Sequence, residues 1–122
     1  MFNATILEHF ERPRNAGELA APALLAEASN PVCGDILRLW VLPEAGSIRE
    51  IRFKAKGCVA AIASASMLTE MVRGRKLEEA SKLSSQEISA ALGGLPPESG
   101  HAAALAVETL KIALQQALAR PG

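Results

Sequence analysis

The sequence is poor in aromatic residues and has no excess of charge. It holds three Phe, one Trp and no Tyr, so it lacks the base-stacking surface typical of proteins that bind single-stranded nucleic acid. Its 13 basic residues are balanced by 13 acidic residues. This balance argues against nucleic acid and against an anionic membrane surface as partners.

Long hydrophobic runs and a signal sequence are also missing. The longest apolar stretch, residues 59–68, is interrupted by Ser64 and Ser66 and is too short to span a bilayer. No charged segment followed by an apolar one opens the chain. We therefore expect a cytoplasmic protein whose two cysteines, Cys33 and Cys58, stay reduced. A disulfide between them is the alternative that the sequence leaves open.

The length and the uniform composition predict one domain. A chain of 122 residues is long enough for one hydrophobic core. No repeat or linker divides it, so we expect a single domain over residues 1–122. Phe2, Ile6 and Phe10 recur at helical spacing, and Pro13 ends this first predicted helix.

Alternation of apolar and polar residues predicts strands in the first half of the chain. Residues 35–42 and 50–56 alternate with a period of two, and the second of these segments reads as a half-buried edge strand. Residues 43–47 between them read as a hairpin turn. Residues 20–28, which are rich in alanine, are expected to form a further short strand.

Helical spacing returns after Cys58, and Gly74 ends that helix. Ser84 and Glu87 form a capping box that predicts a short helix through Leu92. A last helix is expected to pack through a stripe of apolar residues and to carry one basic residue near its end: Val107, Leu110, Leu114, Leu118 and Arg120. This order predicts an α+β fold, in which helices cover one face of a small three-stranded antiparallel sheet.

Four polar side chains fall at the ends of these predicted elements. Cys33 lies in the turn before one strand, and Asp35 follows two residues later, so both side chains can point the same way if that stretch is extended. Cys58 lies where another strand becomes a helix, and His101 lies in the first turn of the last helix. Two thiols, a carboxylate and an imidazole are donors that can form a tetrahedral metal site.

The spacing of these residues does not by itself establish a metal site, because the cysteines are far apart and form no CxxC pair. A purely structural interpretation makes Cys58 a small buried residue, His101 a surface helix cap and Asp35 a turn residue. His9 is given the same structural interpretation. A further interpretation makes Cys58 a nucleophile, with His101 as its base and Asp35 orienting the base. No nucleophile-elbow or oxyanion pattern accompanies it.

Motifs along nearly the whole chain are similar to those of a known family. His9–Asn15 is followed by the motif Asn30–Asp35, then by Gly57-Cys58 with small residues after it, and then by Leu95–Pro97 and residues 101–106. In this order they resemble the first helix and the three ligand motifs of the NifU/IscU-type iron–sulfur cluster assembly scaffold family. Members of that family carry a cysteine directly after the histidine of the third motif. This chain has Ala102 there.

The resemblance implies a NifU/IscU-like fold and a scaffold rather than an enzyme. Such a scaffold assembles a [2Fe–2S] cluster from iron and from sulfur supplied by a cysteine desulfurase, and passes the cluster to acceptor proteins. By this resemblance Cys33 and Cys58 are thiolate ligands, His101 lies beside the cluster, and Asp35 is linked to the lability of the cluster. Family members also bind zinc at the same site.

Ala102 departs from the family pattern in a way that bears on function. A methyl group cannot ligate, so Cys33, Asp35, Cys58 and His101 would have to close the site. Two thiolates suffice in Rieske centres, where two histidines complete the set. The missing cysteine is also a sulfur acceptor in the family, so we expect sulfur transfer to be impaired or rerouted through the remaining cysteines.

A second departure concerns the chaperone-binding segment. Glu98-Ser99 follows Leu95–Pro97 where the family has Val-Lys, so we do not expect unchanged recognition by the Hsp70 partner.

Two functions are therefore consistent with the sequence. The first is a scaffold that binds iron or a [2Fe–2S] cluster, with a cluster shared across a homodimer as one arrangement. The alternative is a divergent paralogue without cluster assembly. That paralogue would hold zinc through Cys33, Asp35, Cys58 and His101, or no metal, and would act by binding partner proteins.

Overall fold

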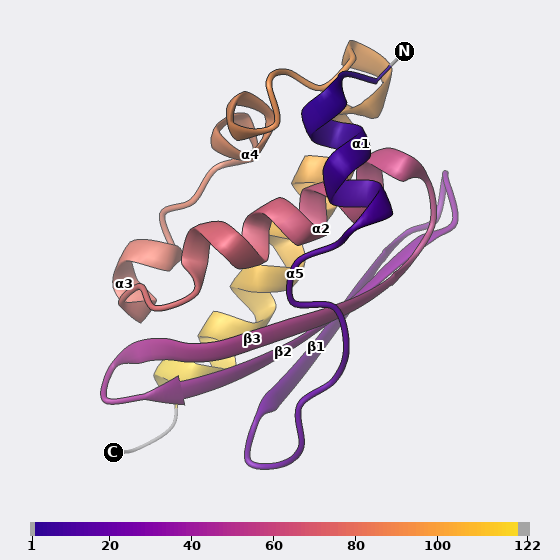
Figure 1. The fold of residues 1–122 in the computed structure, drawn as a ribbon. Coiled ribbons are helices and arrows are strands. Elements are labelled where there is room, and N and C mark those ends of the chain that lie inside the picture. Colours follow the sequence, from indigo (N-terminus) through magenta and orange to yellow (C-terminus); the bar gives the residue numbers. More distant parts are fainter. Residues whose placement is uncertain (1, 120–122) are drawn as a thin grey trace.

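The computed structural model describes residues 2–119, and the predicted position of Arg120 lies outside them. Its elements, in chain order, are α1 (Ala4–Glu11), β1 (Leu24–Asn30), β2 (Asp35–Glu44), β3 (Ser47–Lys56), α2 (Val59–Val72), α3 (Leu77–Ala80), α4 (Ser85–Ala91), the 3₁₀ helix η1 (Pro97–Ser99) and α5 (Gly100–Ala119). The predicted α+β class and the three-stranded antiparallel sheet are confirmed. Figure 1 shows α2 and α5 packed over the same face of that sheet.

The sheet has the order β1-β2-β3, and both pairs of strands are antiparallel. Leu39 of the central strand β2 pairs with Ala26 of β1 and Phe53 of β3. All three side chains are buried, since they point to the face that the helices cover. The predicted edge position of the segment 50–56 is confirmed, because β3 is the last strand of the sheet.

The hairpin between β2 and β3 is shorter than predicted. Pro43 and Glu44 continue β2, and the turn consists of Ala45 and Gly46, with φ values of 53° and 80°. Positive φ at both positions is the geometry that a two-residue hairpin needs in order to match the twist of its strands. Pro43 has no N–H for the ladder, and the register shifts between Leu42 and Pro43.

The bounds of β1 also differ from those that the sequence predicted. It begins at Leu24 rather than at residue 20 and continues to Asn30, where Asn30 pairs with Asp35 of β2. The extension follows from this pairing, which the alanine-rich sequence does not reveal. Helix α3 was not predicted at all, and its four residues are too few to give a helical period.

The capping box at the start of α4 is confirmed. Ser84 Oγ accepts a hydrogen bond from the backbone N–H of Glu87, and the Glu87 side chain accepts one from the Ser84 N–H. The predicted helix ends as expected, with Leu92 as its C-cap. None of the helices within residues 2–119 combines the length and the apolar character that a membrane span requires.

The apolar stripe of α5 differs from the predicted one at its last member. Val107, Leu110 and Leu114 are buried, but Leu118 is 54% exposed and Ala117 is buried in its place. Successive steps of four residues drift around a helix that has 3.6 residues per turn, so Leu118 leaves the face that Leu110 and Leu114 share.

A short strap after α1 covers the outer edge of β3. Ala16 forms a parallel bridge with Phe53. The Phe53 N–H donates to the Asn15 carbonyl at 3.0 Å, and the Gly17 N–H donates to the Phe53 carbonyl at 2.9 Å. These bonds satisfy backbone groups that an edge strand otherwise leaves open. Helix α1, which precedes the strap, packs against α2.

Helix α2 contains two buried serines with different surroundings, which allows a matched test. Ser66 Oγ accepts a hydrogen bond from the Arg14 N–H at 2.9 Å and lies 2.7 Å from His9 Nδ1. Ser64 Oγ has no hydrogen-bond partner among the residues that the structure describes. Ser64→Ala is expected to raise the free energy of unfolding by about 1 kcal/mol, and Ser66→Ala to lower it by about 1–3 kcal/mol. Urea unfolding of both variants checks this, and equal effects would contradict it.

His9 is buried between α1 and α2, in agreement with a structural role. Burial, and then the charge of Arg14, lower the pKa of His9 below its ordinary value of 6.5, against the opposite effects of Glu70 and Glu8. The unfolded chain therefore binds a proton at His9 more readily than the folded chain does. It follows that His9 costs stability as the pH falls below 6.5. Above that pH it costs none.

The expected result is a Tm that falls between neutral pH and a pH well below 6.5, with a smaller fall in His9→Gln. Differential scanning calorimetry at the two pH values measures both. A fall of the same size in His9→Gln would show that other groups cause it.

Candidate metal centre

The turn between β1 and β2 presents Cys33 at the surface and Asp35 in the interior. The Gly34 N–H donates to the Asn30 carbonyl at 2.7 Å, and the Val32 N–H donates to Asn30 Oδ1 at 3.0 Å. These bonds close the turn, after which Asp35 begins β2. The Cys33 thiol is exposed, whereas Asp35 is only 2% exposed.

Two helix N-termini bring the other two side chains to the same place. Cys58 is the N-cap residue of α2 and is exposed. Its backbone N–H donates to Asp35 Oδ1 at 3.3 Å. His101 lies in the first turn of α5, directly after η1, and its side chain is 31% exposed.

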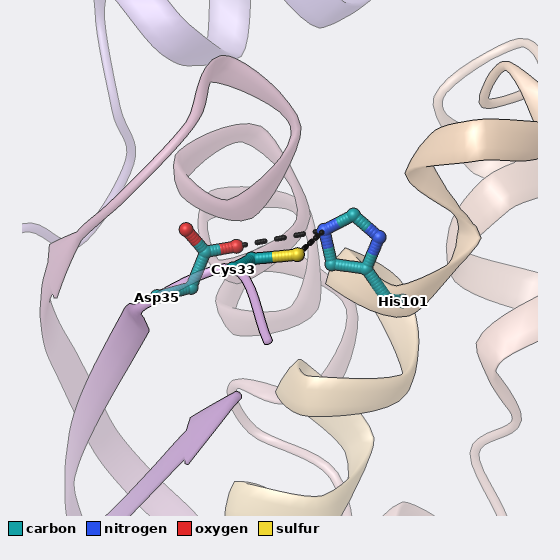
Figure 2. A group of neighbouring side chains, drawn as sticks. All are labelled: Cys33, Asp35 and His101. Atoms are coloured by element: carbon teal, nitrogen blue, oxygen red, sulfur yellow. Dashed lines mark hydrogen bonds and ion pairs between the residues drawn. The ribbon is translucent and has the colours of Figure 1, made fainter. Parts of the chain in front are cut away.

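The functional atoms of Cys33, Asp35 and His101 form one compact group, which Figure 2 shows with the three side chains pointing toward one another. Cys33 Sγ lies 3.3 Å from His101 Nε2, and Asp35 Oδ2 lies 3.6 Å from the same nitrogen. One donor atom from each of the three residues lies within 4.8 Å of the others.

Cys58 adjoins this group through the carboxylate. Its Sγ lies 3.6 Å from Asp35 Oδ2, so the thiol can donate a weak hydrogen bond to that oxygen. Cys58 is not one of the three residues in the compact group. All four side chains named from the sequence therefore meet at one end of the sheet, with Asp35 between the two cysteines.

These positions differ from those that the purely structural interpretation of the four residues expects. Cys58 is exposed rather than buried, and Asp35 is a buried strand residue rather than a surface turn residue. His101 contacts Cys33 and Asp35 instead of capping a helix at the surface. The nucleophile interpretation paired Cys58 with His101, but the thiol that contacts the imidazole is that of Cys33.

Ala102 lies next to these donors but does not face solvent. It is 1% exposed and packs in a small apolar cluster with Ala60 and Ala61 from the first turn of α2. Phe2 and Leu95 pack against the same cluster. In this chain the side chain of Ala102 packs between the first turns of α5 and α2.

Sequence reasoning included Gly57 as part of a motif but missed its place in the site. The residue follows the last paired residue of β3, and a Cβ built on it would lie 2.3 Å from Asp35 Oδ1. The sequence shows a glycine between a predicted strand and the helix that starts at Cys58. This pattern locates Gly57 at a turn but does not reveal its contact with Asp35.

The donor set fits a metal that accepts soft and intermediate ligands. Two thiols, one imidazole and one carboxylate are ligands that zinc and iron both accept. The exposed thiols leave the site open to solvent on one side.

Comparison with known proteins gives one consistent result. The model of the family described as "NifU-like N terminal domain" matches residues 1–122. The iron–sulfur cluster assembly scaffold protein IscU of Aquifex aeolicus is 42% identical over 123 residues, which cover 99% of this chain and 78% of that protein. The protein of the same name from Azotobacter vinelandii is 38% identical over 118 residues, which cover 93% of this chain and 91% of that protein.

A solved structure shows the same fold. The N-terminal part of a nitrogen-fixing NifU-like protein from Brucella abortus superposes with a TM-score of 0.78 at 17% identity, covering 98% of this chain and 95% of that one. Motifs, fold and whole-length relatives agree, and the chain belongs to the family of NifU-like N-terminal domains.

Proposed function

We propose that this chain is an iron–sulfur cluster assembly scaffold. It binds iron or a [2Fe–2S] cluster at Cys33, Asp35, Cys58 and His101 and passes the cluster to acceptor proteins. The observation that carries the proposal is the convergence of these donors, with atoms of Cys33, Asp35 and His101 within 4.8 Å of one another and Cys58 Sγ 3.6 Å from Asp35. The whole-length likeness to proteins named as scaffolds supports it.

The chemistry of the donors suits a cargo that is held and then released. Thiolates bind iron in iron–sulfur clusters, and two thiolates with two nitrogen ligands are enough in Rieske centres. A carboxylate is a hard ligand and holds a soft cluster less firmly than a third thiolate would. A carboxylate ligand from Asp35, in a site that lacks a third cysteine, therefore favours release. The exposure of both thiols gives an acceptor direct access to the cluster.

Zinc is the second candidate for the bound metal, and the compact group favours it. Cys33, Asp35 and His101 offer one sulfur, one oxygen and one nitrogen atom to a single point, with Cys58 beside them. Such mixed sets are acceptable to a tetrahedral zinc ion. In this alternative the chain is a metal-binding module that acts through partner proteins.

The partners follow from the reaction. Assembly needs a sulfur donor of the cysteine desulfurase class and an apo-protein that accepts the product. We propose that the chain acts as a carrier of the cluster and not as an enzyme, that residues 1–122 form one domain, and that two copies can share one cluster.

Anaerobic reconstitution with ferric iron and sulfide tests the proposal. The expected product is coloured, contains iron and sulfide in equal amounts, and converts an added apo-ferredoxin to its cluster-bound form. Cys33→Ala and Cys58→Ala should each give a colourless product. A colourless wild-type product without iron contradicts cluster assembly, and stoichiometric zinc in that protein would favour the alternative.

A further inference from the structure

The end of the β2–β3 ladder places a glycine against the buried carboxylate of the metal centre. Ile36 pairs with Lys56, so the next residues outward, Asp35 and Gly57, lie side by side where the ladder ends. Gly57 also leads the chain from β3 into Cys58, the N-cap of α2. It therefore lies between two of the donors of the site.

The Asp35 carboxylate occupies the space that a side chain of Gly57 would need. A Cβ on Gly57 would lie 2.3 Å from Oδ1, 2.7 Å from Cγ and 3.1 Å from Cβ of Asp35. Contacts of this length are not tolerated between non-bonded atoms, so one of the two groups would have to move. The carboxylate is the end of a short side chain and can rotate, whereas the Gly57 backbone is fixed by the strand before it and the helix after it.

The carboxylate has little freedom to move without loss of its function. It is almost fully buried, and in its present position it accepts the Cys58 N–H at 3.3 Å and lies 3.6 Å from His101 Nε2. A rotation away from Gly57 changes both distances. A buried carboxylate that loses its donor is also less stable there.

We propose that Gly57 is a positioning residue of the metal centre: because it has no side chain, it leaves the space in which the Asp35 carboxylate is held beside Cys58 and His101. The inference rests on the proposed function, since it treats Asp35 as one of the metal-binding residues. It goes beyond that function because it explains the position of the Asp35 carboxylate by Gly57, a residue that binds no metal itself.

The chain offers a matched control. Gly17 has φ 131° and Gly57 has φ 159°, and an added Cβ on Gly17 meets no atom within 4 Å. Gly17→Ala therefore carries the backbone cost of a side chain at positive φ without a clash. It lies outside the metal centre, in the strap along β3.

The experiment compares zinc binding by the wild-type chain, Gly57→Ala, Asp35→Ala, the double variant and Gly17→Ala, in competition with a chromogenic chelator. Gly57→Ala is expected to weaken zinc binding about 10- to 100-fold, as loss of a supporting group at a metal site does. Asp35→Ala, which removes the carboxylate itself, should weaken binding at least as strongly, and the double variant should bind no more weakly than Asp35→Ala. Gly17→Ala should bind as the wild type does. The visible spectrum of the Co²⁺ forms should be the same in Gly57→Ala and Asp35→Ala.

The outcomes separate the inference from the proposed function. Wild-type affinity in Gly57→Ala, or full weakening by Gly57→Ala in the Asp35→Ala background, overturns the positioning role and leaves the metal centre intact. A wild-type chain that binds neither Zn²⁺ nor Co²⁺ contradicts the proposed site.

Thermal unfolding of the metal-free proteins tests the positioning role without any metal. Gly57→Ala should lower the Tm more in the wild-type background than in Asp35→Ala, since removal of the carboxylate eliminates the contacts of 2.3 and 2.7 Å and leaves only the 3.1 Å contact with the Cβ of residue 35. If Gly57→Ala alone does not fold, the double variant tests the positioning role. A folded double variant supports that role, and an unfolded one overturns it.

Discussion

Replacement of Cys33 by alanine is expected to weaken zinc binding strongly, whereas replacement of Cys58 is expected to weaken it much less. Cys33 Sγ belongs to the compact group and lies 3.3 Å from His101 Nε2. The free energy of zinc binding at structural sites is about 10–16 kcal/mol, so loss of one ligand should weaken zinc binding on the order of 10³-fold. Cys58 contacts the group through Asp35 and should cost about 10- to 100-fold.

Chelator competition measures both affinities on the same scale. Circular dichroism of the two metal-free variants is the control, because both thiols are exposed and neither change should disturb the fold. Equal losses in the two variants would contradict the assignment of Cys33 to the inner position. For the [2Fe–2S] form, in contrast, both variants should fail, since cluster iron depends on sulfur ligands.

The largest effect on stability is expected in α5. Leu110→Ala should lower the free energy of unfolding by about 2–5 kcal/mol, because it opens a cavity in the core. Leu118→Ala removes the same atoms from the same helix and should change it by less than about 0.5 kcal/mol. Leu110 is 1% exposed and Leu118 is 54% exposed. Urea unfolding of the pair gives the comparison, and similar losses would show that the buried face of α5 is wrongly placed.

The sheet could be predicted from the sequence because its signals are local. Alternation in residues 35–42 and 50–56 identifies both strands of the hairpin and the faces that they bury. The exact turn could not be predicted, since proline is usually a turn residue and Pro43 here lies within β2, directly after a register shift. The limits of β1 depend on pairing with β2, and alanine carries no preference that would reveal them.

Helix α5 shows why the buried face was only partly predictable. Half of its buried positions are alanines, among them Ala103, Ala106, Ala113 and Ala117. Alanine fits a buried or an exposed helix position equally well, so Val107 and the leucines set the predicted stripe. Leu118 was included for this reason, although the helical period carries it to the surface.

The members of the candidate site were predictable, but their mutual contacts were not. Motif positions at the ends of elements identified Cys33, Asp35, Cys58 and His101, which the fold brings together. Which thiol contacts His101 depends on how α5 packs on the sheet, across most of the length of the chain. The depth of Asp35, and the space that Gly57 leaves for it, are also products of packing.

The proposed site brings sulfur, nitrogen and oxygen donors from separate elements of the fold to one metal. X-ray absorption spectroscopy of the zinc-loaded protein tests it most directly. We expect zinc to have a mixed coordination shell, with sulfur at about 2.3 Å and nitrogen or oxygen at about 2.0–2.2 Å. The scattering from the imidazole should be lost in His101→Ala. A shell of nitrogen and oxygen alone, or an unchanged spectrum in His101→Ala, would contradict the account.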